Sequence, residues 1–132
     1  MGAYRGMATL VLAEDEDDIR MIAARILRRA GYTVIETMDG AEALEAVREH
    51  RPAAVVSDID MPVMSGVGLC LALREDPATE DLPVIFVSGS LTPGDTRPAE
   101  AGATAILSKP FLPRELVTCV QGALGQGAVR AE

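Results

Sequence analysis

The segment TLVLAEDEDDIRMIAARILRRAG, residues 9–31, decides the fold. It opens with a short, nearly continuous apolar run, which is typical of a strand buried on both faces of a parallel sheet. Five consecutive carboxylates, Glu14–Asp18, follow this run. Apolar residues then recur at helical spacing as far as Gly31, which stands where a helix C-terminal glycine belongs. The segment therefore predicts a buried parallel strand, an acidic junction and an amphipathic helix.

The same unit recurs along the chain. Periodicity predicts four further strands and three further full helices: strands at 33–36, 53–57, 82–88 and 104–108, and helices at 41–47, 68–75 and 112–124. Between the last two strands, Pro93, Gly94 and Pro98 leave room only for a short helix within 97–101. Parallel strands joined by right-handed helical crossovers predict a doubly wound α/β fold. We expect a flavodoxin-like three-layer sandwich with a five-stranded parallel sheet of order 2-1-3-4-5.

Composition limits the class of protein. The 132 residues suit one domain, and 48% of them are apolar, which excludes a disordered chain. The formal net charge of −8 argues against nucleic acid and against an anionic membrane surface as partners. No apolar run approaches the ~20 residues that cross a bilayer.

Domain bounds and location are also predicted. We assign residues 9–124 to the domain, 1–8 to an N-terminal extension and 125–132 to a C-terminal tail. Cys70 and Cys119 lack metal-binding spacing, so we interpret them as free thiols in a reducing, cytoplasmic setting.

Polar side chains stand at the carboxyl ends of four predicted strands. They are carboxylates after the first and third strands, a hydroxyl at the fourth and an amine after the fifth: Glu14, Asp15, Asp58, Asp60, Ser88 and Lys109. Carboxyl ends of parallel strands share one edge of the sheet, and ligands bind there where strand order reverses. The first and third strands are neighbours in the predicted order, so Glu14, Asp15 and Asp58 should converge.

Three converging carboxylates need compensation for their mutual repulsion. A hard divalent cation such as Mg²⁺ takes one or two carboxylates as ligands and leaves positions for water and phosphate. Lys109 supplies a second, fixed cation. Together with the Ser88 hydroxyl, these groups suit phosphoryl transfer, and a carboxylate can itself accept the phosphoryl group as an acyl phosphate.

Four motifs resemble those of the response-regulator receiver domain of two-component signalling. In chain order they are LVLAEDEDDIR, VVSDIDMPVMSG, VIFVSGS and GATAILSKPF, and the resemblance covers about residues 9–124. The ordered combination is highly specific, whereas any one motif alone is weak. The resemblance implies a phosphoprotein like the single-domain chemotaxis regulator. It would not be an enzyme beyond catalysing its own phosphorylation and autodephosphorylation.

The resemblance also implies a role for each site residue. Asp58 would be the phosphoacceptor, and Ser88 and Lys109 would bond to phosphoryl oxygens. Mg²⁺ (or Mn²⁺) would have these ligands: Asp15, Asp58, the backbone carbonyl of Asp60, and Glu14 through water. The donor would be a phosphohistidine on a sensor histidine kinase or a histidine phosphotransfer protein. The Lys109–Pro110 bond is expected to be cis.

One position departs from the family pattern. The family usually has Tyr or Phe three residues before the lysine, where this chain has Ile106. Ile106 cannot make the inward swing of an aromatic ring that accompanies switching in the family. We therefore expect an atypical output route, through residues 89–101, to a protein target that the sequence does not identify. We expect a monomer or a weak phosphorylation-dependent dimer.

Alternatives stay open at this point. VVSDID resembles the D-x-D start of haloacid-dehalogenase phosphatases, although Pro62 stands where that motif has Thr or Val. A degenerate receiver would be a constitutive binding module, and an intact one could be stand-alone or part of a longer regulator or hybrid kinase. The Asp60 side chain either faces solvent without a role or repels phosphate and water, and so tunes phosphate lifetime. Within the acidic run, Asp17 is the predicted cap of the first helix.

Overall fold

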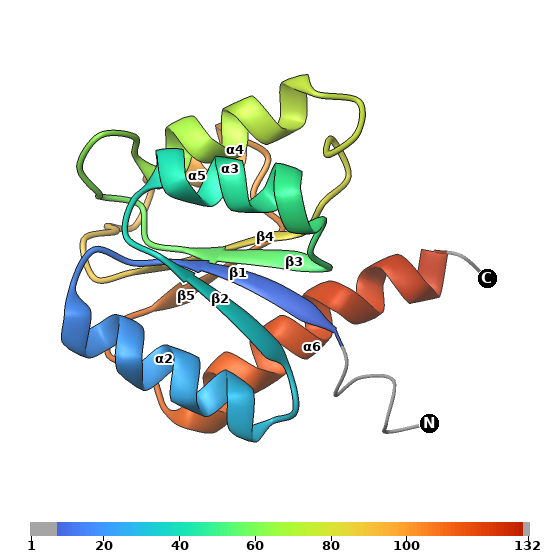
Figure 1. Ribbon diagram of the computed structural model, residues 1–132. Coiled ribbons are helices and arrows are strands. Elements are labelled where there is room, and N and C mark those ends of the chain that lie inside the picture. Colours follow the sequence, from blue (N-terminus) through green and yellow to red (C-terminus); the bar gives the residue numbers. More distant parts are fainter. Residues whose placement is uncertain (1–7, 131–132) are drawn as a thin grey trace.

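The computed structural model describes residues 8–130, with side chains described as far as residue 125. Strands and helices alternate along it: β1 (Thr9–Ala13), α2 (Asp17–Arg29), β2 (Thr33–Thr37), α3 (Gly40–His50), β3 (Ala54–Ser57), α4 (Gly66–Glu75), β4 (Val84–Ser88), α5 (Arg97–Glu100), β5 (Ala105–Ser108) and α6 (Pro113–Arg130). The strands pair in parallel in the order β2-β1-β3-β4-β5, as predicted. Figure 1 shows the sheet between two layers of helices, with α3 and α4 on one face and α2 and α6 on the other.

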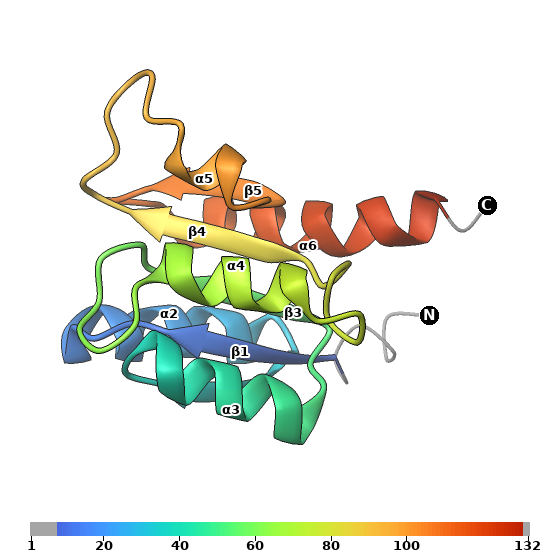
Figure 2. The same cartoon turned by 90° about the horizontal axis from the view of Figure 1, so that it is seen from above.

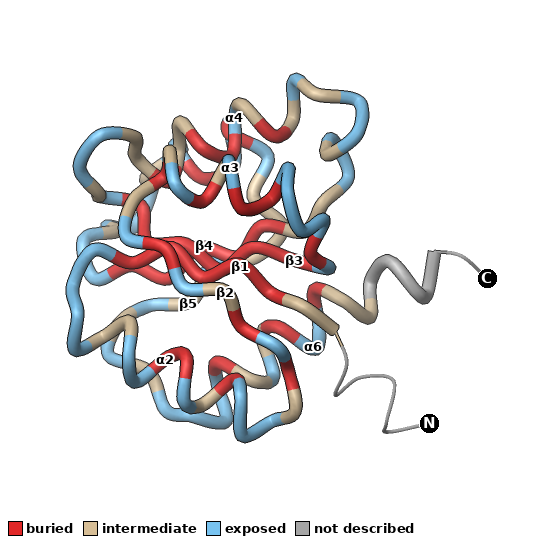
Figure 3. Tube along the Cα trace, viewed as in Figure 1, coloured by how far each residue is buried: buried red, intermediate tan, exposed pale blue. Residues whose placement is uncertain are grey.

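Alternating residues of each buried strand supply two separate cores. In β1, Leu10 and Leu12 join the cluster under α2 and α6, while Val11 and Ala13 join the cluster under α3 and α4. All four are at most 3% exposed, which explains why the strand reads as a continuous apolar run. Figure 3 shows the same burial along the central strands, and Figure 2 shows α3 and α4 lying along the sheet.

The strand predictions are confirmed to within two residues, and β1 matches residue for residue. The fourth helix region contains only α5, four residues long, as its Pro and Gly content predicted. Helix α4 begins at Gly66, two residues before the prediction, because the Ser65 side chain accepts a hydrogen bond from Gly68 N at 3.0 Å and caps the helix there.

Two local predictions are wrong. The N-cap of α2 is Glu16, not Asp17, and no side chain caps that helix. Asp17 is already helical, and its carboxylate instead accepts a hydrogen bond from Arg20 Nη2 at 2.6 Å. Helix α6 continues to Arg130, six residues beyond the predicted stripe, so the loss of apolar pattern did not mark its end. Residues 1–7 and 131–132 lie outside the described part of the chain, and the domain bounds stay a prediction.

The cis Lys109–Pro110 bond is confirmed. Within residues 8–130, no helix combines the length and the apolar character that crossing a membrane requires. Cys70 and Cys119 are both free; Cys70 is buried and Cys119 is partly exposed.

Candidate functional site

The strand ends bring the predicted polar residues together around one cavity, called the strand-end cavity below. Its volume is about 290 Å³, and it opens at the carboxyl edge of the sheet. Eight residues line it. Five of them are predicted site residues, namely Asp15, Asp58, Asp60, Ser88 and Lys109. The other three are Glu16, Gly89 and Ser90. The sixth predicted residue of the strand ends, Glu14, is 3% exposed and reaches the site through its contact with Lys109.

Asp58 directly follows β3 and is hydrogen-bonded to the end of β1. Its backbone N–H donates to the Ala13 carbonyl at 3.0 Å, so the residue stays attached to the neighbouring strand. Its Oδ1 accepts a hydrogen bond from Ile59 N at 2.7 Å, while Oδ2 lies 3.3 Å from Lys109 Nζ. One carboxylate oxygen is therefore engaged by the backbone, and the other faces the only lysine of the sequence.

Lys109 follows the edge strand β5 and contacts the acidic groups at the ends of β1 and β3. Its Nζ lies 2.8 Å from Glu14 Oε1 and 4.0 Å from Glu16 Oε1. Burial raises the pKa of the Glu14 carboxyl, and the hydrogen bond from Lys109 offsets only part of that rise. Burial alone would lower the pKa of Lys109, but the hydrogen bond to Glu14 and the charge of Asp58 outweigh it and raise the pKa. The amine thus stays charged and anchors both carboxylates.

The carboxylates are close enough to hold a cation. Oxygen atoms of Glu14, Glu16 and Asp58 all lie within 4.8 Å of one another. Three carboxylates against one lysine leave net negative charge, and carboxylate oxygens are the ligands that hard divalent cations prefer. Asp15 is exposed and lies outside this cluster, although it lines the same cavity. Glu16 was not singled out from the sequence as a candidate ligand.

A chain of hydroxyl and carboxylate contacts crosses the mouth of the cavity. Ser88 is 2% exposed, and its Oγ lies 3.1 Å from the Oγ of Ser90. The Ser90 hydroxyl donates to Asp60 Oδ2. Ser90 was not singled out from the sequence, because a serine two residues beyond a strand is most often a loop residue.

Gly66 is the final glycine of the motif VVSDIDMPVMSG, and the structure shows why a glycine stands there. Its backbone N–H donates to the Ile59 carbonyl at 2.8 Å, so α4 starts against the loop that follows Asp58. A Cβ on Gly66 would overlap the main-chain oxygen of Asp58. The glycine is therefore required by close packing rather than by an unusual backbone angle.

Gly66→Ala should lower the free energy of unfolding by about 3 kcal/mol, since the overlap is with backbone that cannot swing away. The matched control is Gly122→Ala in α6, where an added Cβ meets nothing within 4 Å. That change should be neutral or raise stability by up to about 1 kcal/mol. Urea unfolding of both variants checks this, and equal stabilities for the two would contradict the packing argument.

Ile106 lies on the edge strand β5, opposite Phe86 of β4. Phe86 belongs to the core under α3 and α4, and neighbouring residues in parallel register share a face. The Ile106 side chain is nevertheless 48% exposed, because the four-residue α5 leaves that face partly uncovered. Its role as a switch position stays a prediction.

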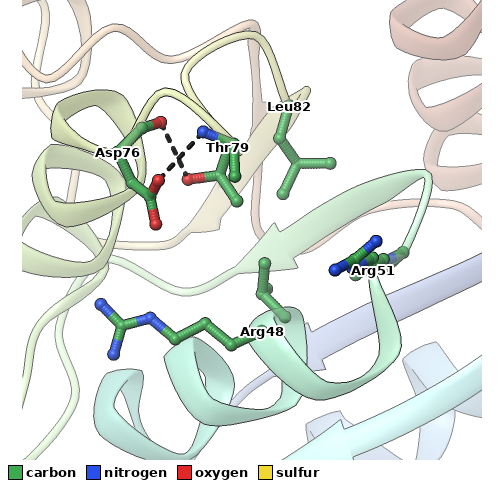
Figure 4. A pocket seen from close by; sticks show the side chains of 8 residues that line it. Arg48, Arg51, Asp76, Thr79 and Leu82 are labelled. Atoms are coloured by element: carbon green, nitrogen blue, oxygen red, sulfur yellow. Dashed lines mark hydrogen bonds between the residues drawn. The ribbon is translucent and has the colours of Figure 1, made fainter.

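A second cavity, of about 330 Å³, lies near the C-terminal end of α3 and the loop before β4. Figure 4 shows Arg48, Arg51, Asp76, Thr79 and Leu82 around it. Thr79 Oγ1 donates to the Leu73 carbonyl at 2.7 Å, and the Asp76 carboxylate accepts from Ala78 N at 2.9 Å, so these groups stabilise the local turn. The cavity holds none of the strand-end residues.

Comparison with known proteins agrees with this geometry. The family model for the response regulator receiver domain matches residues 10–121. The chain is 40% identical over 116 residues to the transcriptional regulatory protein PrrA of Mycobacterium tuberculosis. The matched region covers 87% of this chain and 49% of PrrA. It therefore spans about half the length of that relative.

Two solved structures extend the comparison. The chemotaxis response regulator CheY4 of Vibrio cholerae is 31% identical with a TM-score of 0.83, covering 89% of this chain and 98% of that one. The receiver domain of the sensor histidine kinase PA1611 of Pseudomonas aeruginosa, solved with a magnesium ion coordinated in its active-site cleft, is 27% identical. Its TM-score is also 0.83, with 89% and 98% covered.

A doubly wound parallel sheet with a cluster of carboxylates and one lysine at its carboxyl edge defines a class of signalling domain. This chain belongs to the response regulator receiver domain family of two-component signalling.

Proposed function

We propose that this receiver domain accepts a phosphoryl group on Asp58 in a Mg²⁺-dependent reaction and signals through protein contacts. The observation that carries the proposal is the placement of the Asp58 carboxylate, with one oxygen bonded to Ile59 N and the other facing Lys109. A carboxylate fixed at one oxygen and adjacent to a cation is suited to in-line attack by its second oxygen.

The reaction balances without any further reactant. The free oxygen of Asp58 would form a bond to phosphorus while the bond from phosphorus to the donor imidazole nitrogen breaks. The electron pair leaves on that nitrogen. Lys109 and the Ser88 hydroxyl would bond to phosphoryl oxygens, as the family resemblance predicts. The chain acts as substrate and catalyst of its own modification, and autodephosphorylation by water would return it to the starting state.

Mg²⁺ (or Mn²⁺) fits the carboxylate cluster. Glu14 and Asp58 belong to the predicted ligand set and to the observed cluster, and Glu16 joins them as a candidate. Asp15 and the Asp60 carbonyl remain proposed ligands. When bound, the cation would neutralise charge that develops on the phosphoryl oxygens. The magnesium ion coordinated in the PA1611 receiver domain supports this choice.

The proposed phosphodonor is a phosphohistidine on a sensor histidine kinase or a histidine phosphotransfer protein. The only histidine of this chain is His50, at the C-terminal end of α3, away from the strand-end cavity. The proposed donor histidine therefore lies outside these 132 residues. We further propose a cytoplasmic protein that is monomeric or forms a weak phosphorylation-dependent dimer, without nucleic acid or membrane as direct partners.

Incubation with acetyl phosphate and Mg²⁺, followed by intact mass measurement, tests the proposal. A single phosphoryl adduct that forms with Mg²⁺ and does not form with EDTA is expected. Absence of an adduct in both conditions would sink the proposed function.

The output route runs through residues 89–101, where Ser90 N donates to Ser88 Oγ at 3.2 Å. A phosphoryl group on Asp58 would compete for the Ser88 hydroxyl, and so change the protection of that segment. Hydrogen exchange with and without beryllofluoride and Mg²⁺ should show changed protection across 89–101 and unchanged protection in β2. Equal protection of 89–101 in the two states would count against this route.

A further inference from the structure

The Asp60 carboxylate places a negative charge at the mouth of the strand-end cavity, and this charge opposes the proposed reaction. Asp60 lines the cavity two residues after Asp58, and its side chain is 59% exposed. A phosphoryl donor that approaches Asp58 is negatively charged, so the Asp60 carboxylate should repel it. The ion pairs of Lys109 are with Glu14, Glu16 and Asp58 and not with Asp60.

A second cation reaches Asp60 from the start of α5. Arg97 is the first residue of α5, and its Nη1 lies 3.8 Å from Asp60 Oδ1. Among residues 8–125, the ion pairs at this cavity involve two cations, Lys109 and Arg97. The other oxygen of Asp60 accepts a hydrogen bond from the Ser90 hydroxyl, so its two oxygens contact the loop after β4 and the start of α5.

Asp95 holds the Arg97 guanidinium in place. Its Oδ2 lies 2.8 Å from Arg97 Nη2, and Arg97 Nε lies 3.2 Å from both carboxylate oxygens. Asp95 Oδ1 also accepts the backbone N–H of Arg97 at 3.0 Å. The planar guanidinium is therefore fixed by a forked contact with Asp95, while Nη1 lies within ion-pair distance of Asp60.

We propose that Arg97 is a positioning residue for phosphoryl transfer, which offsets the charge of Asp60 at the mouth of the cavity and so admits the anionic donor. The inference rests on the proposed function of Asp58. It differs from a direct role in catalysis, because Arg97 acts on the donor through Asp60. The sequence offered no sign of this contact, since the two partners lie 37 positions apart.

Time courses of phosphorylation by acetyl phosphate at saturating Mg²⁺ test this, with the donor at low concentration so that its entry limits the rate. Arg97→Ala should lower the rate about two- to fivefold, the factor expected for an exposed ion pair at this distance. Arg97→Lys keeps the charge and should retain most of the rate. In an Asp60→Asn background, Arg97→Ala should have little effect, because no charge is left to offset.

Arg48→Ala is the matched control, because it removes one positive charge at the second cavity (Figure 4) and should leave the rate unchanged. The loss caused by Arg97→Ala should also shrink at high salt, which a purely structural role would not predict. Two outcomes overturn the inference: an Arg97→Ala rate equal to the unmodified protein, or the same loss with and without Asp60. Failure of the unmodified protein to form any adduct would overturn the proposed function as well.

Discussion

Asp58→Asn is expected to abolish phosphorylation, with a rate from acetyl phosphate lowered by at least about three orders of magnitude. The amide keeps the size of the side chain and can still accept from Ile59 N. It lacks the anionic oxygen that would attack phosphorus, and it removes one negative charge from the candidate metal ligands. Chemistry and cation binding are therefore weakened together.

Intact mass after incubation with acetyl phosphate and Mg²⁺ measures this effect. Asp81→Asn is the matched control, because Asp81 is exposed and lies between α4 and β4, away from the strand-end cavity. It should become phosphorylated at the rate of the unmodified protein. An adduct on Asp58→Asn at that same rate would place the acceptor on another carboxylate and contradict the assignment.

Lys109→Met should lower the free energy of unfolding by about 3 kcal/mol at neutral pH without divalent cations. Glu14 and Asp58 are 3% and 8% exposed, and the change leaves two buried carboxylates without their cation. Removing one partner of a buried ion pair lowers the free energy of unfolding, because the remaining charge stays desolvated without compensation. Methionine keeps the length of the apolar stem, so the loss reports mainly on charge.

The loss should depend on pH with a defined sign. Burial already raises the pKa of Glu14 above 4.5, and removal of Lys109 takes away an interaction that lowers it. A carboxyl whose pKa is raised by folding stabilises the fold below its unfolded pKa, and that stability is lost as pH rises through the folded pKa. The destabilisation by Lys109→Met should thus be smaller near pH 4.5 than at neutral pH, because the Glu14 part of it is lost on protonation.

Mg²⁺ should restore part of the lost stability. A ligand at ten times its Kd stabilises the native state by about 1.4 kcal/mol, and the variant carries one more uncompensated negative charge for the cation to neutralise. Urea unfolding with EDTA or Mg²⁺ measures the difference, with Arg48→Met as the control for loss of a positive charge. A Mg²⁺ effect no larger in Lys109→Met than in the unmodified protein would contradict this electrostatic account.

The main features of the site could be predicted because they lie at strand ends. Asp58, Ser88 and Lys109 each stand at the carboxyl end of an apolar run, and parallel pairing brings such ends to one edge. Strand order then places Asp58 beside β1. Asp17 shows where this reasoning stops: a carboxylate near a helix start favours a cap, but the backbone had already become helical at that residue.

The sequence by itself determined the α/β alternation, the parallel sheet and the residues at its carboxyl edge, because strand burial and helix periodicity are written in local apolar patterns. Only the tertiary structure decided that Glu16 joins the carboxylate cluster, that Gly66 packs on the Asp58 backbone, and that Arg97 meets Asp60. These contacts depend on loop paths and side-chain rotamers that no local pattern encodes. They form when folding brings separate loops together at one edge of the sheet.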